Sequence, residues 1–243
     1  MNLQSVDQQP AYLIHRRPYR ETAVLLDVLT PEYGLKGLVA HGARRAHSSL
    51  AGLLQPNRPL LISWRSRAEL GTVKAVDSAG PAFRLAGRAL WCSLYLSELI
   101  QRLLERGDPC PELFAHYQHA LDRLQYSDHD AGCEQTVLRT FERRLLDALG
   151  YGLILDVTGD TAEPLQADRN YRYQPDAGAL AVGVGSGVVV GGRSLLAMAR
   201  DDYTDPQVRE DAKRLMRVCL AVHLGAKPLV SRALFGVSGA SEG

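Results

Sequence analysis

Short apolar segments alternate with turn-forming residues through the first 80 positions of the chain. Each segment is rich in aliphatic and β-branched residues, which predicts five strands, at residues 11–15, 22–30, 37–41, 59–64 and 70–76. Between the third and fourth strands, residues 42–57 carry leucines spaced for one or two turns of helix. Five strands with a helix after the third are typical of an OB-fold barrel.

The spacing of apolar positions changes from about residue 81 onward. A helical period predicts four helices, at residues 89–106, 112–124, 135–149 and 205–224, with a last turn at residues 227–235. An irregular insert at about residues 155–192 contains a small β-hairpin, residues 170–174 and 179–190. The predicted fold is therefore α+β, with a five-stranded OB-fold domain at residues 1–80. A helical domain with a hairpin insert follows at residues 81–243.

The charge of the chain is distributed unevenly between these two parts. All 243 residues together carry a formal net charge of +1. Residues 1–80 hold ten basic and six acidic residues, an excess of +4, and the remainder has an excess of −3. A basic domain can attract a polyanion while the whole molecule stays near neutral, so the first domain is the candidate nucleic-acid-binding domain.

Several classes of protein are disfavoured by what the sequence contains. The four cysteines are far apart and form no Cys-x-x-Cys pair, which argues against a zinc site or a disulfide scaffold. No nucleophile elbow or phosphate-binding loop occurs, so we expect no enzymatic activity, no cofactor and no metal. The opening residues do not resemble a signal peptide, and we expect a cytoplasmic protein.

Basic residues gather at the strand ends and loops of the predicted barrel, where they could converge on one face. Guanidinium and ammonium groups bind phosphates, so we predict DNA binding by Arg16, Arg17, Arg20, Lys36, Arg44, Arg45, Arg65, Arg67 and Lys74. Aromatic rings in the same region, on which bases could stack, are Tyr12, Tyr19, Tyr33 and Trp64. The flanking apolar residues of Trp64 favour a core position. The alternative is that the arginines form an ordinary solvated face.

A second candidate site lies on the predicted helix at residues 135–149. Arg139 and Arg143 are four residues apart, share one face and border apolar residues. Such a face could hold an acidic peptide with apolar residues. Ion pairing of these arginines with Glu134 and Glu142 on the same helix is an equally good interpretation.

Several short motifs in a fixed order resemble those of the RecO family of recombination mediators. They are HRRPYRET at residues 15–22, GARR at 42–45, LQP at 54–56, ELGT at 69–72, YLSEL at 95–99, LGYG at 149–152 and KPLVSR at 227–232. The resemblance implies an OB-fold domain followed by a helical domain. It also implies binding of single- and double-stranded DNA, annealing of complementary strands and a place at the bacterial nucleoid.

The same resemblance implies partners and one departure. The implied partners are RecR and the single-stranded-DNA-binding protein, whose acidic C-terminal tail would dock near Arg139, so that RecA is loaded onto gaps in the RecF pathway. Many relatives hold zinc with cysteines in the insert, but here no cysteine lies between Cys133 and Cys219. We therefore expect the insert to lack zinc.

Two other functions stay open at this point. An OB-fold barrel alone does not discriminate against the 2′-hydroxyl, so an RNA-binding or translation-associated protein is the main alternative. A small-molecule enzyme is the other, although no motif supports it. Non-enzymatic DNA binding and annealing is the preferred hypothesis.

Overall fold

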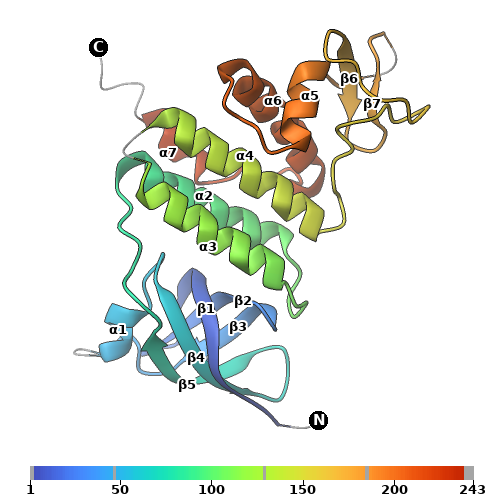
Figure 1. The fold of residues 1–243 in the computed structure, drawn as a ribbon. Coiled ribbons are helices and arrows are strands. Elements are labelled where there is room, and N and C mark those ends of the chain that lie inside the picture. The colour runs from blue at the N-terminus through green and yellow to red at the C-terminus, as the bar shows by residue number, and fades with distance from the viewer. Residues whose placement is uncertain (1–2, 46–47, 128–129, 184–185, 238–243) are drawn as a thin grey trace. The chain divides into compact units, whose positions relative to one another are not determined.

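The computed structural model describes residues 3–45, 48–127, 130–183 and 186–237 (Figure 1). The chain forms two compact units. The first contains the described residues up to Tyr126 together with those from Leu229 onward, and the second contains Ser127–Pro228. The proposed division into domains at residues 1–80 and 81–243 would split the first unit further, and it stays a prediction.

Five strands of the first unit close into a barrel in the order β1-β2-β3-β5-β4. Their bounds are β1 Gln4–Tyr19, β2 Ala23–Thr30, β3 Gly34–Ala40, β4 Pro59–Ser66 and β5 Gly71–Ser78. A short helix, α1 (Ser49–Leu53), follows β3. These observations confirm the predicted α+β class, the five strands and the helical turn after the third strand.

Strand β1 is much longer than the five residues that its apolar pattern predicts. Its first half pairs with β4 and its second half with β2, and the register shifts between Val6 and Gln9 and again between Leu13 and His15. The flanking residues are polar because only one part of this long strand lies over the core. Periodicity therefore detected only the buried centre.

The barrel interior is filled by alternate residues of the strands, which point to one side of a sheet. Leu26, Leu38, Ile62 and Trp64 are fully buried there. The core position expected for Trp64 is thus confirmed.

Strand β3 is paired by β5 over only two residue pairs, Leu38–Gly71 and Val39–Thr72. Residues 104–110, which connect the next two helices, cover the rest of its edge, because Arg106 forms bridges to Gly34 and Leu35. Gly34 has a φ of +55°, and a Cβ there would lie 1.9 Å from the Asp108 carbonyl oxygen. Only glycine permits both this left-handed backbone and this close approach.

Three helices complete the first unit: α2 (Gly87–Leu103), α3 (Pro111–Gln125) and α7 (Arg232–Val237). In Figure 1, α2 and α3 run side by side beyond one end of the barrel. Tyr12 of β1 packs beneath them, with its ring centroid 5.2 Å from that of Phe114 and 5.4 Å from that of Tyr117. Helix α2 ends three residues earlier than predicted, which frees Arg106 to reach β3.

Helix α7 is held on α2 by Glu98. The Glu98 carboxylate accepts hydrogen bonds from the Val230 and Ser231 amides, each at 2.8 Å, and from the Ser231 hydroxyl at 2.5 Å. Burial raises the pKa of Glu98, but these hydrogen bonds and nearby Arg102 outweigh it and hold the pKa below its ordinary value. The charged carboxylate therefore fixes the returning C-terminal segment.

The second unit consists of helices and a small sheet. The helices are α4 (Ala131–Ala148), α5 (Gly192–Ala199) and α6 (Pro206–Leu224). The sheet has the order β7-β6-β8, with β6 Asn170–Gln174, β7 Gly178–Ala181 and β8 Val188–Gly191. The predicted second hairpin strand is therefore two strands; residues 184 and 185 between them lie outside the described residues. Helix α5 was not predicted.

Helices α4 and α6 are capped at their N-termini by Asp130 and Asp205. Each carboxylate accepts a hydrogen bond at 2.8 Å from the backbone amide two residues on, that of Gly132 or Gln207.

Among the helices that the structure describes, none is both long and apolar enough to cross a membrane.

Replacing Gly34 tests the close approach of β3 and the α2–α3 connection. We expect Gly34→Ala to lower the free energy of unfolding by more than about 2 kcal/mol, because the new Cβ would meet the Asp108 carbonyl at a left-handed φ. Urea unfolding provides the measurement. Gly52→Ala is the control: it lies in α1 with nothing within 4 Å and should stabilise by up to about 1 kcal/mol. Equal stability of the two variants would contradict the packing described.

Candidate nucleic-acid interface

One register row crosses the outside of the barrel from β1 to β4. Arg17 pairs with Leu25, Leu25 with Val39, Val39 with Thr72 and Thr72 with Arg65. Directly paired residues point to the same side of a sheet, so all five lie on the outer side of the barrel. We call these five residues the outer row. Four steps of about 4.8 Å between neighbouring strands give it a length of about 19 Å along the barrel surface.

Three further predicted residues lie in two turns at one end of the outer row. The Arg44 amide donates to the Thr22 carbonyl at 3.0 Å, and its guanidinium Nη1 donates to the Arg20 carbonyl at 3.2 Å. Arg45 belongs to the same turn, because its amide donates to the Gly42 carbonyl at 3.1 Å. Arg44 therefore ties the turn after β3 to the turn between β1 and β2.

At the far end of the outer row, Arg67 lies in the connection that follows β4. Lys74 is the extra residue of a bulge in β5, between the pairs Ser63–Ala75 and Trp64–Val73. Both side chains are exposed. Five predicted cations therefore adjoin the two ends of the outer row.

Arg16 and Lys36 do not share this surface. Arg16 pairs with the core residue Leu26, and its Nη1 donates to the Leu54 carbonyl at 2.8 Å, so it closes one end of the barrel. Lys36 is half-buried: burial lowers its pKa, Glu69 opposes that shift and Arg106 adds to it.

The exposed arginines of the barrel lack counter-charges. Of the nine predicted residues, all except Lys36 are exposed, and none forms an ion pair within the part of the chain that the structure describes. Unpaired guanidinium groups on one barrel surface produce a positive field that attracts phosphate.

Only one of the four candidate aromatic rings lies beside these cations. Trp64 and Tyr12 are buried, and Tyr33 meets the Trp64 ring edge-on at 5.2 Å. Tyr19 is half-buried on the same side of β1 as Arg17, and the Arg20 guanidinium lies 5.2 Å from its ring centroid. Tyr19 is therefore the ring best placed to meet a base.

Sequence reasoning missed one cation of this region, Arg106, because the helical pattern continued through it. Its guanidinium donates to Asp27 on β2 at 2.7 Å. Two signals could have found Arg106: a glycine at position 37, where the predicted third strand begins, and the helix-breaking Gly107 that follows Arg106.

The two arginines predicted to bind a peptide are engaged within the second unit. Arg139 is buried and its Nη2 donates to Glu142 at 2.7 Å. Arg143 binds Asp201 through two hydrogen bonds, at 2.9 and 2.8 Å, and Arg144 bonds to the same carboxylate. The pairing of Arg139 with Glu142 follows the alternative interpretation. A peptide that binds these guanidinium groups must compete with Glu142 and Asp201.

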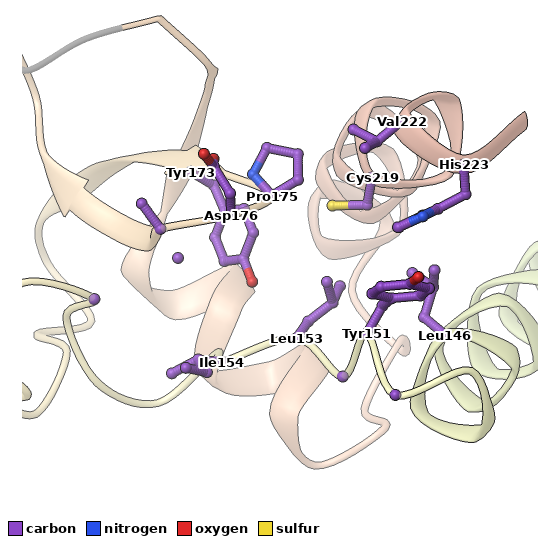
Figure 2. Close-up of a pocket in the computed structure, with 15 residues that line it drawn as sticks. Leu146, Tyr151, Leu153, Ile154, Tyr173, Pro175, Asp176, Cys219, Val222 and His223 are labelled. Atoms are coloured by element: carbon purple, nitrogen blue, oxygen red, sulfur yellow. The ribbon is translucent and has the colours of Figure 1, made fainter. Parts of the chain in front are cut away.

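A hollow of about 680 Å³ lies in the second unit between the ends of α4 and α6 and the β6–β7 turn. In Figure 2, Tyr151 lies against His223 on one side, whereas Tyr173, Pro175 and Asp176 form the other. The Tyr151 and His223 rings stack with centroids 4.0 Å apart. Burial raises the pKa of the Cys219 thiol to about 12, so it stays protonated. The lining is mostly apolar, with polar groups at Asp176 and His223.

No group of three or more histidine, cysteine or acidic side chains that could hold a metal occurs among the described residues. Their four cysteines are free thiols. The structure thus offers a cationic surface on a closed five-stranded barrel, and this defines a class of barrel protein suited to binding a polyanion.

Comparison with known proteins agrees with this class. The family model "Recombination protein O N terminal" matches residues 1–82, and "Recombination protein O C terminal" matches residues 84–233. The DNA repair protein RecO of Nitrosococcus oceani is 46% identical over 228 residues, covering 93% of this chain and 91% of that protein. RecO of Methylococcus capsulatus is 44% identical over 225 residues, with the same coverage.

The chain therefore belongs to the RecO family, whose members act in DNA repair and recombination. The resemblance of the seven motifs is confirmed.

Removing Arg139 tests the buried pair in the second unit. Arg139→Ala leaves Glu142 buried without this cation, so we expect the free energy of unfolding to fall by on the order of 3 kcal/mol. Urea unfolding measures this, and the exposed Arg217→Ala should change it by less than about 0.5 kcal/mol. An Arg139→Ala variant as stable as the parent, but weakened toward an acidic peptide with an apolar end, would instead identify Arg139 as a ligand-binding cation.

Proposed function

We propose that this protein is a non-enzymatic recombination mediator that binds single- and double-stranded DNA and anneals complementary strands. The observation that carries the proposal is the outer row, with unpaired arginines at both ends and more in the adjoining turns. Guanidinium groups bind phosphates, and membership of a DNA repair family favours DNA as the polyanion that is bound.

Annealing is a problem of repulsion between two polyanions. A protein that neutralises phosphates on both strands lowers that repulsion without reading bases. The outer row exposes the guanidinium groups of Arg17 and Arg65, the Thr72 side chain and part of Leu25, with no side-chain amide to read base edges. Little sequence preference is therefore expected, and stacking on Tyr19 would add to affinity for unpaired bases.

The wider role in this proposal includes partners. With RecR, the protein would help to load RecA onto DNA coated by the single-stranded-DNA-binding protein, in the RecF pathway. The acidic tail of the coating protein would bind the helical part of the chain near Arg139 and Arg143. Support for these partners is family membership, and the proposed DNA-binding domain is residues 1–80.

Salt dependence provides the first test. If the barrel engages about five phosphates, the plot of log affinity for single-stranded DNA against log salt should have a slope of about −3.5. In the double variant Arg17→Gln and Arg65→Gln the slope should be less steep by about 1.4, which corresponds to an affinity about 25-fold lower at 0.1 M salt. Fluorescence anisotropy of a labelled oligomer measures both.

The matched control removes two exposed arginines elsewhere, with Arg123→Gln and Arg193→Gln, and should leave the slope unchanged. If the Arg17→Gln and Arg65→Gln double variant keeps the parental slope, the outer row is not the DNA-binding surface. Competition between DNA and RNA oligomers of one sequence addresses the alternative function, because a clear preference for RNA would favour it.

Strand annealing is the second test. We expect the protein to accelerate pairing of two complementary oligomers, and the row double variant to lose most of that acceleration because it neutralises fewer phosphates. A fluorescence-quenching pair on the two strands follows the rate. If the protein binds DNA with the expected salt slope but never accelerates pairing, the annealing part of the proposal fails while DNA binding stands.

A further inference from the structure

The outer row has cations only at its ends. Arg17 and Arg65 are separated by about 19 Å of surface, and the three residues between them, Leu25, Val39 and Thr72, carry no charge. A nucleic-acid strand places a phosphate every few ångströms, so a strand that follows the row would pass several phosphates over this uncharged middle.

The connection between α2 and α3 runs along the first part of the β3 edge, at Gly34 and Leu35. Besides the bridges of Arg106 to Gly34 and Leu35, the Gly107 amide donates to the Leu35 carbonyl at 3.3 Å. Further along, the Cys110 amide donates to the Pro31 carbonyl at 2.9 Å. The backbone of Arg106 is therefore anchored to the barrel rather than free in a loop.

One acceptor, Asp27, and a glycine position the Arg106 side chain. Its Nη2 donates to Oδ1 of Asp27 at 2.7 Å, while Gln101 donates to the other oxygen of that carboxylate at 3.3 Å. Its Nη1 lies over Gly37, where a Cβ would come within 3.0 Å. Glycine at position 37 thus makes room for the guanidinium on the barrel surface.

In the ion pair between Arg106 and Asp27, the guanidinium is the member that is exposed to solvent. The Asp27 side chain is 11% exposed and the Arg106 side chain 45% exposed. The carboxylate lies beneath and holds the guanidinium in one orientation, and this preorganisation reduces the entropy lost when a ligand binds. A guanidinium has five N–H groups, so donation to Asp27 leaves others for a phosphate.

Register places this guanidinium opposite the uncharged middle. His15 pairs with Asp27 and Asp27 with Gly37, which makes a row parallel to the outer row and two residues away on the same side of the sheet. Two residues along a strand correspond to about 6.6 Å. Arg106 therefore lies over β2 and β3, between the strands that carry Arg17 and Arg65.

We propose that Arg106 binds a phosphate of the nucleic-acid strand that crosses the barrel, and that Asp27 is the residue that positions it. This inference rests on the proposed function of the outer row and extends that surface to a residue of the α2–α3 connection. The surface then has cations at both ends and beside its centre.

Two single variants separate phosphate binding from a structural role. Arg106→Gln and Asp27→Asn both break the same ion pair, so both should lower the free energy of unfolding, which urea unfolding measures. For DNA, Arg106→Gln should make the log–log salt slope less steep by about 0.7 and lower affinity about five-fold at 0.1 M salt. Asp27→Asn keeps the guanidinium, so the salt slope should stay at the parental value, while affinity should fall by less than in Arg106→Gln because the cation remains but is no longer held in one orientation.

The possible outcomes are distinct when Arg123→Gln on α3 is the matched charge control. An equal loss of salt slope in Arg106→Gln and Asp27→Asn would show that Arg106 acts only through the fold, and would overturn the inference. The inference would also be overturned if Arg106→Gln kept the parental salt slope while the Arg17 and Arg65 double variant still bound DNA more weakly. The proposed function would then stand. If that double variant is unchanged as well, the outer row is not the DNA surface and the proposed function loses the observation that carries it.

Discussion

Closure of the barrel depends on the two residue pairs that join β3 to β5. Gly71 permits this junction, because a Cβ there would lie 2.8 Å from Leu38 and 3.0 Å from Trp64. The junction carries the register from β2 and β3 across to β4, and so brings Arg17 and Arg65 onto one surface. Because it is so short, it also leaves the rest of the β3 edge to the α2–α3 connection. Shape and charge of the candidate surface both follow from this constraint.

The pairing of cations differs between the barrel surface and the second unit. Arg139, Arg143 and Arg144 bond to carboxylates, where they hold side chains together. The exposed arginines of the barrel have no such partners among the described residues, and their mutual repulsion contributes nothing favourable to folding. A fold retains such an arrangement most readily where an external anion supplies the missing charge.

The sequence was sufficient to predict those strands and helices that are specified by a local pattern of apolar residues. Apolar periodicity located the barrel strands and four helices, and the apolar neighbours of Trp64 indicated a core position. The outer row could not be predicted, because it depends on which residues pair across four strand junctions. Arg106 was hidden for a similar reason: its helical pattern continues, but tertiary contacts with β3 end the helix at Leu103. Burial of Arg139 likewise depends on the packing of the second unit.

The first unit contains residues from both sides of the second, and this has a consequence during synthesis. The barrel, α2 and α3 are complete by Tyr126, whereas α7 follows only after the whole second unit. At about 5–20 residues per second, a ribosome needs about 5–20 s for those roughly one hundred residues. Throughout that interval Glu98 and the aromatic face of α2, where Trp91 and Tyr95 later meet Phe235, remain uncovered on the nascent chain. A chaperone that shields this face would therefore act on a barrel already folded and awaiting its last helix.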